Sequence, residues 1–173
     1  FEDQFVYEVT MKRKVKDNIG SPSNRIYFLG SITGDVADGW DNGYEFGYNE
    51  DGRYFLQMRN ADNVTILTSG STPHINPYGW NKLTVYTDYP WLDFWINDQY
   101  LGYSIINDDP VKYTQGYVGV AGYKGIKKTA LLVDKAKLYY STAFPYPITA
   151  SVDGIRDPAL ELKVDPEVVI PVE

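Results

Sequence analysis

Three aspartates in one short loop are the residues best suited to metal chemistry in this sequence. Asp35, Asp38 and Asp41 lie within residues 34–42, together with two glycines and an asparagine. Ca²⁺ prefers hard oxygen ligands such as carboxylates and amide carbonyls, so this loop predicts a calcium site. The spacing differs from that of an EF-hand loop, and acidic loops are also common as plain solvated turns. Ca²⁺ is therefore the one cofactor that we expect, with a solvated turn as the alternative.

Residues for catalysis are much harder to find. His74 is the only histidine, and it lies in a proline-flanked loop without the Gly-x-Ser-x-Gly turn that would present a nucleophilic serine. Glycoside hydrolysis needs two carboxylates facing the scissile bond. Glu45 has no acidic residue two positions away, and Asp93 is followed at that distance only by Trp95. The chain also has no cysteine, which excludes thiol catalysis. We predict that the protein is not an enzyme.

Along residues 91–97 the even positions are apolar, and the odd positions are tryptophan or short polar residues. In a strand, successive side chains point to opposite faces. If the apolar residues at the even positions face the core, the outward face consists of Trp91, Asp93, Trp95 and Asn97. The same argument turns Tyr86 of the preceding strand outward, next to Trp95. Trp40, in the acidic loop, is a separate candidate for an exposed ring.

This predicted patch has three possible roles. Flat rings beside short polar acceptors suit sugars, whose C–H faces stack on aromatic rings while their hydroxyls form hydrogen bonds. Tyr and Trp are equally typical of protein interfaces. Alternatively, another segment of the same chain covers the rings. The partner that we predict is therefore a glycan or a neighbouring protein subunit.

The elements that would position these residues are short strands. Period-two alternation recurs along the chain, and the 3.6-residue periodicity of helices is nearly absent. About ten strands with turn signals roughly every 8–12 residues indicate an all-β sandwich or barrel. We predict one sandwich domain over residues 1–143. Residues 144–173 contain five of the ten prolines, and we expect an extended tail that pairs at a sheet edge, in cis or in trans.

The charge of the chain excludes one class of partner. Acidic side chains number 23 against 16 basic ones, for a net charge of −7. Such a surface repels nucleic-acid phosphates, so we expect no nucleic-acid binding. No apolar run approaches the roughly 18 residues of a membrane helix, so we expect no membrane insertion.

Four sequence motifs occur in a characteristic order. They are a Gly-Tyr-x-Phe-x-Tyr strand with its turn and return strand (43–56), Gly-x-Asn-x-Leu-x-Val (79–85), a strand ending in Asn-Asp (92–98) and Gly-x-Val-Gly-Val (116–120). This order resembles the concanavalin A-like lectin/glucanase superfamily, in its LamG-like branch, over about residues 5–140. The resemblance implies a jelly-roll sandwich of two antiparallel sheets. The Glu-x-Asp-x-(x)-Glu cluster of the glucanases in this superfamily is missing.

Two departures from the superfamily pattern stand out. Asp98 replaces the usual turn glycine, which a type I′ turn tolerates because Asn and Asp reach positive φ most readily. Relatives also carry an earlier strand before the one that begins at Phe5, and the tail is a candidate to take its place at the sheet edge.

Together these features predict a non-catalytic, extracellular or cell-surface binding module that is carbohydrate-binding or adhesive. The alternative is a structural subunit that self-assembles into homo-oligomers by exchanging edge strands or tails. A glycoside hydrolase is the third, less favoured hypothesis.

Overall fold

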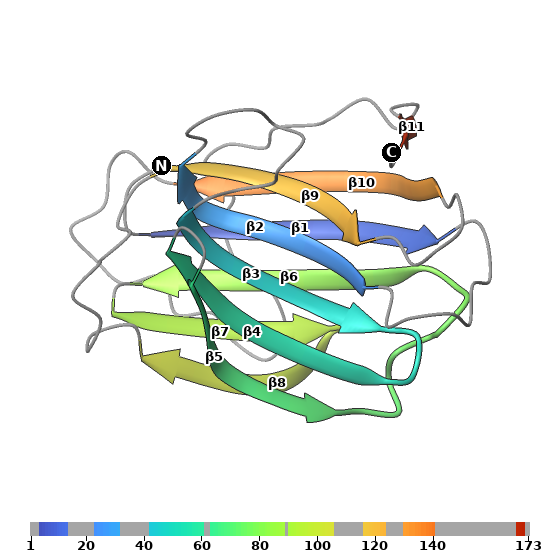
Figure 1. Cartoon of the computed structure of the whole chain (residues 1–173), viewed down its shortest axis with the longest axis horizontal. Helices are drawn as coiled ribbons and strands as arrows, with labels where there is room; N and C mark the ends of the chain where they lie inside the picture. The colour runs from blue at the N-terminus through green and yellow to red at the C-terminus, as the bar shows by residue number, and fades with distance from the viewer. Residues whose placement is uncertain are drawn as a thin grey trace.

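The chain folds into two antiparallel β-sheets that lie face to face (Figure 1). The computed structural model describes residues 4–13, 23–31, 42–60, 63–88, 90–105, 116–123, 130–140 and 169–171. These residues form strands β1 (Gln4–Arg13), β2 (Ser23–Ser31), β3 (Asn42–Asn49), β4 (Arg53–Asn60), β5 (Asn63–Ser71), β6 (Asn81–Asp88), β7 (Trp91–Ile96), β8 (Gln99–Ile105), β9 (Tyr117–Tyr123), β10 (Ala130–Tyr140) and β11 (Val169–Pro171). The predicted all-β jelly-roll sandwich is confirmed.

The strand order shows how segments distant in sequence are brought together. One sheet has the order β11-β10-β1-β6-β7-β8, and the other has the order β5-β4-β3-β2-β9. β8 is therefore an edge strand of the six-stranded sheet, while β6 and β7 are interior strands. Within the described residues, no helix is long and apolar enough to cross a membrane.

The core lies between the two sheets and follows the alternation of the sequence. Tyr44, Phe46 and Tyr48 of β3 are at most 1% exposed and belong to one cluster with Phe94 of β7. The ring centroids of Phe46 and Phe94 are 5.3 Å apart with planes tilted by 59°, which joins the two sheets at the centre. Burial of large side chains of this kind is the main favourable term in folding.

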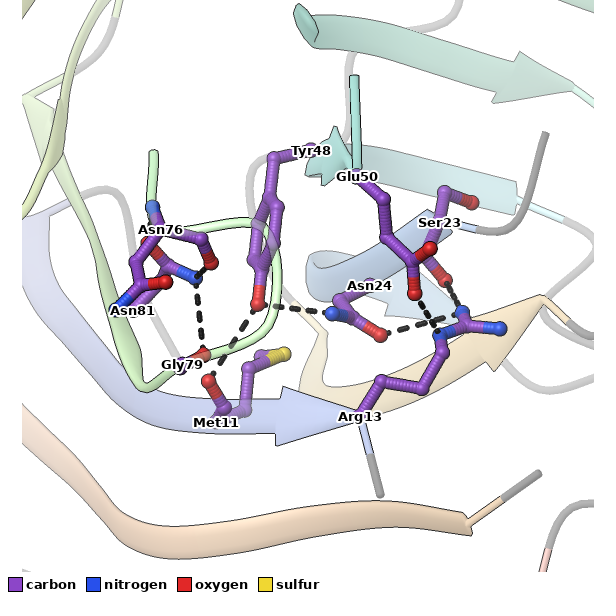
Figure 2. Close-up of polar contacts among 9 residues, drawn as sticks. All are labelled: Met11, Arg13, Ser23, Asn24, Tyr48, Glu50, Asn76, Gly79 and Asn81. Atoms are coloured by element: carbon purple, nitrogen blue, oxygen red, sulfur yellow. Dashed lines mark hydrogen bonds and ion pairs between the residues drawn. The ribbon is translucent and has the colours of Figure 1, made fainter. Parts of the chain in front are cut away.

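A buried polar network also links the sheets, at one end of the sandwich (Figure 2). The Tyr48 hydroxyl of β3 accepts a hydrogen bond from Asn24 Nδ2 of β2 at 2.8 Å and donates one to the carbonyl of Met11 in β1 at 3.4 Å. Arg13 Nη2 of β1 donates to the carbonyl of Ser23 at 2.8 Å and to Asn24 Oδ1 at 3.2 Å. Buried polar groups are tolerated when they are paired in this way.

Two asparagines of the sequence motifs hold the loop before β6. Asn81 is fully buried, and its Nδ2 donates to the carbonyls of Asn76 at 2.6 Å and Gly79 at 3.2 Å. Asn97, in the turn after β7, donates from Nδ2 to Asn81 Oδ1 at 2.9 Å and to the carbonyl of His74 at 2.7 Å. The two motifs therefore meet in space, and their asparagines support the backbone of the loop.

The turn between β7 and β8 has the predicted conformation. Asn97 and Asp98 have φ values of 51° and 65°, in the left-handed region that a type I′ turn requires. Asn97 Oδ1 accepts a hydrogen bond from the backbone N–H of Lys82 at 2.8 Å, which ties the turn to β6.

The tail contributes a short edge strand. β11 pairs antiparallel with β10, in the register Ala130↔Pro171, Leu131↔Ile170 and Leu132↔Val169. The pairing is at the outer edge of the six-stranded sheet, beyond β1 and β10. The division of the chain near residue 143, and pairing of the tail between chains, stay predictions.

Candidate functional site

Five side chains form an aromatic surface on the outer face of the six-stranded sheet, at the edge made by β7 and β8. β7 contributes Trp91, Asp93 and Trp95, which alternate with the buried Leu92, Phe94 and Ile96. β8 adds Tyr100 and Tyr103. We call these five residues, namely Trp91, Asp93, Trp95, Tyr100 and Tyr103, the β7–β8 aromatic surface.

The rings of this surface form two pairs. The centroids of Trp91 and Tyr103 are 5.5 Å apart with an angle of 59° between the ring planes, and those of Trp95 and Tyr100 are 5.3 Å apart with an angle of 52°. Tilted pairs at these distances are favourable aromatic contacts. Trp91, Tyr100 and Tyr103 are nevertheless 45%, 50% and 59% exposed, so much of each ring is open to a ligand.

Asp93 lies between the two pairs and is tied to one of them. The Tyr100 hydroxyl donates a hydrogen bond to Asp93 Oδ1 at 2.7 Å. Partial desolvation of the ring, together with this hydrogen bond and the negative charge of Asp93, raises the pKa of Tyr100 to about 12. The phenol therefore remains a neutral donor at ordinary pH, and the hydrogen bond fixes the orientation of both groups.

An irregularity in the pairing of β7 and β8 brings both tyrosines to the same face. Tyr100 and Tyr103 are three residues apart, so simple alternation would place them on opposite faces. The register shifts between Phe94 and Trp95: Phe94 pairs with Gly102, but Trp95 pairs with Tyr100. Such a bulge inserts one extra residue and reverses the alternation. Gly102 has a φ of 143°, a conformation that glycine adopts at low cost.

The structure brings together only part of the predicted patch. Trp91, Asp93 and Trp95 lie on one face, as predicted. Tyr100 and Tyr103 were missed, because nothing in the local sequence marks the bulge except the glycine at 102. Asn97 instead uses its side chain to hold the loop and turn described above.

The expectation that Tyr86 is an exposed ring is wrong. It is only 6% exposed, although it lies on the outer face, where it pairs with Val6 of β1 and Asp93 of β7. Its hydroxyl accepts a hydrogen bond from Gln4 Nε2 at 3.3 Å and donates one to Asp88 Oδ2 at 3.5 Å. Tyr86 therefore has paired neighbours on both sides, whereas Tyr100 and Tyr103 lie on the edge strand β8.

Trp40, Asp35, Asp38 and Asp41 lie outside the described residues, so the calcium site stays a prediction. Within the part of the chain that the structure describes, no group of three or more His, Cys, Asp or Glu side chains could hold a metal ion.

Comparison with known proteins gives similarity in structure only. No family model and no curated protein matches the chain. Among solved structures, the carbohydrate-binding module CBM66 from Bacillus subtilis has 14% sequence identity and a TM-score of 0.61, over 79% of this chain and 74% of that one. Sheep galectin-11, in complex with glycerol, has 13% identity and a TM-score of 0.53, over 76% of this chain and 92% of that one.

A third similar structure is the binding domain of botulinum neurotoxin DC in complex with rat synaptotagmin II. It has 9% identity and a TM-score of 0.52, over 79% of this chain and 32% of that one. At these identities the comparisons show the fold alone. The chain has the jelly-roll β-sandwich fold of these binding modules and lectins, while no match supports the narrower LamG-like branch.

Proposed function

We propose that this chain is a non-catalytic carbohydrate-binding module of an extracellular or cell-surface protein, and that the β7–β8 aromatic surface holds the sugar. The observation that carries the proposal is the presence of ring pairs, three of whose four rings are exposed, on both sides of a hydrogen-bonded carboxylate. The apolar faces of sugar rings stack on aromatic side chains, and Asp93 would accept hydrogen bonds from sugar hydroxyls beside them.

The dimensions of the surface favour an oligosaccharide over a single sugar. Trp91 and Trp95 are four residues apart on β7, and a strand rises about 3.3 Å per residue, so their Cα atoms are about 13 Å apart. Each tryptophan is paired with a tyrosine from β8. A ligand that extends along β7 would contact both ring pairs.

The similar folds support a binding role. CBM66 is a carbohydrate-binding module by its name, and galectin-11 was solved with glycerol, a polyol. A secreted or surface location is consistent with such a role. Glu45, the buried carboxylate of the other sheet, is engaged by two arginines and a glutamine.

The test is binding to an array of neutral glycans, followed by calorimetry with the best ligand. We expect the double variant Trp91→Ala/Tyr103→Ala to weaken binding at least tenfold, because it removes one ring from each of the two strands. Tyr78→Ala is the matched control, since Tyr78 is 49% exposed but lies in the loop before β6. Silence on the array, or equal binding by the double variant, would refute the proposal. Assays for new reducing ends should stay negative.

A structural subunit is the second candidate, and the position of β11 favours it. β11 pairs through only three residues at the edge of the six-stranded sheet, which is the arrangement that allows a tail to exchange between copies. We expect concentration-dependent oligomers in size-exclusion chromatography if this candidate holds. Removal of residues 169–171 should then yield monomers.

A further inference from the structure

The outer face of the five-stranded sheet carries a charged cluster built around Glu45 of β3. Glu45 lies between Tyr44 and Phe46, which face the core, so its side chain points away from the core, yet it is 0% exposed. Its Oε2 accepts hydrogen bonds from Arg25 Nη1 and Gln57 Nε2, both at 2.6 Å, and its Oε1 accepts one from Arg59 Nε at 2.7 Å.

The cluster presents its cations, and not its carboxylate, to solvent. The side chains of Arg25 and Arg59 are 18% and 28% exposed, whereas that of Glu45 is completely covered. A ligand that approaches this face contacts guanidinium groups whose orientation is fixed by their hydrogen bonds to the buried Glu45. Guanidinium is planar and matches a carboxylate in a two-pronged hydrogen-bonding geometry.

A cavity adjoins the cluster on the same sheet. It has a volume of about 360 Å³ and is lined by Asn49, Arg53, Tyr54, Phe55, Ser69, Gly70 and Ser71. The guanidinium carbon of Arg25 lies 5.1 Å from the centroid of the Phe55 ring, so the cluster and the cavity share a wall. The lining combines two aromatic residues, Tyr54 and Phe55, with hydroxyl and amide groups, as in sites for small polar ligands. It also includes Arg53, whose guanidinium pairs with Asp51.

Gly47 allows this arrangement. A Cβ at this position would lie 2.7 Å from Cζ of Phe55 and 3.0 Å from Cγ of Arg25. The first distance is shorter than real Cβ contacts and the second is tighter than most of them, so a larger residue would require the ring and the arginine stem to shift. The absence of a side chain lets Phe55 of β4 and Arg25 of β2 reach across β3 toward each other.

We propose that the cavity and the adjoining arginines form a second binding site, for a saccharide that bears a carboxylate. The carboxylate would pair with Arg25 and Arg59, the hydroxyls would bond to Ser69 and Ser71, and the sugar face would lie against Phe55. The chain as a whole carries a charge of −7, so an anionic ligand needs a local cationic site. This inference rests on the proposed glycan-binding function but uses the opposite sheet.

The test uses trigalacturonic acid as the probe and galactotriose as its neutral counterpart, in isothermal titration calorimetry. We expect the acid to bind at least tenfold more tightly than the neutral sugar, and to bind more weakly as salt is raised. The variant Arg59→Gln should weaken this preference, because it removes one of the two guanidinium groups while Glu45 stays paired with Arg25 and Gln57.

Two further variants examine the cavity. Phe55→Ala should weaken binding of the acid severalfold, because it removes the ring on which the sugar would lie. Ser69→Trp should also weaken binding, because the larger side chain fills the cavity. This second variant keeps Phe55, so it tests the cavity even if loss of Phe55 unfolds the sheet. Trp91→Ala/Tyr103→Ala should keep the binding of trigalacturonic acid unchanged, since its rings lie on the other sheet. That variant therefore separates failure of the proposed function from failure of this inference.

Three outcomes would overturn the inference. Equal affinity for galactotriose would show that the carboxylate is not recognised. Unchanged binding by both Arg59→Gln and Ser69→Trp would show that the acid binds elsewhere. If dextran sulfate bound as tightly as trigalacturonic acid, and Ser69→Trp did not change its binding, the binding would be non-specific electrostatic attraction.

Discussion

Tyr100 illustrates how one polar contact orders an exposed aromatic surface. Its hydroxyl donates to Asp93 across the two strands of the edge hairpin, and its ring packs against Trp95. An exposed ring without such a contact would lose more rotamer freedom when a ligand binds. The hydrogen bond therefore prepares both the ring and the carboxylate for the ligand.

We expect Tyr100→Phe to weaken glycan binding about three- to tenfold, because it removes a hydrogen bond worth about 0.5–1.5 kcal/mol while it keeps the ring. Calorimetry with the ligand found on the array measures this effect. The melting temperature should change little, since Tyr100 is half exposed. Tyr78→Phe is the control, and equal losses in the two variants would contradict the role given to Tyr100.

A second prediction at the scale of residues concerns Ca²⁺ binding by the acidic loop of residues 34–42. If Asp35, Asp38 and Asp41 bind Ca²⁺, calcium should raise the melting temperature and a chelator should reverse the rise, because a ligand that binds only the folded state stabilises it. Replacing the three aspartates by asparagines should remove the response. An unchanged melting temperature with and without chelator, and no heat on calcium titration, would show that the loop is a solvated turn.

At the scale of elements, hydrogen bonds between a loop and the strand ends hold the β7–β8 hairpin in position. The loop of residues 72–80 is attached to β6 by the side chain of Asn81 and to the β7–β8 turn by the hydrogen bond from Asn97 to the carbonyl of His74. These contacts give the motif asparagines a structural role. Through the turn, they also support the strand pair that carries the aromatic surface.

We expect Asn81→Ala to lower the free energy of unfolding by about 1–3 kcal/mol, since it leaves buried hydrogen-bonding partners unsatisfied. Urea denaturation followed by circular dichroism measures the change. Asn63→Ala, at an exposed position in β5, should cost little. Similar losses in both variants would mean that asparagine content, and not the loop contact, determines the stability.

At the scale of the whole molecule, the many buried tyrosines link stability to alkaline pH. Burial raises the pKa of Tyr27 and Tyr48, and it raises the pKa of Tyr86 to about 12. In the unfolded chain these phenols ionise near their usual pKa of about 10. Below that pH both states hold the protons, while above it only the unfolded state releases them.

We therefore expect the free energy of unfolding to be flat with respect to tyrosine ionisation up to about pH 10 and to fall between about pH 10 and pH 12. Each such tyrosine contributes a slope of at most about 1.4 kcal/mol per pH unit. Tyr86→Phe should reduce this slope by the contribution of one tyrosine. Urea denaturation at a series of pH values measures the slope. A slope unaffected by this variant would show that Tyr86 is not protected.

Much of the architecture could be predicted from the sequence because alternation is a local property of a strand. The alternating residues 91–96 identified Trp91, Asp93 and Trp95 as one outward face, and the structure confirms that they share it. Turn chemistry is equally local, so Asn97 and Asp98 were correctly expected to form a tight turn with positive φ.

Only the tertiary structure decided which neighbours these residues meet. Tyr100 and Tyr103 join the aromatic surface through a register shift between two strands, and Tyr86 is buried with Val6 of β1 and Asp93 of β7 as its paired neighbours. The Glu45 cluster likewise combines side chains from β2, β3 and β4. Pairing register and strand position depend on contacts between distant segments, which the alternation within one strand does not contain.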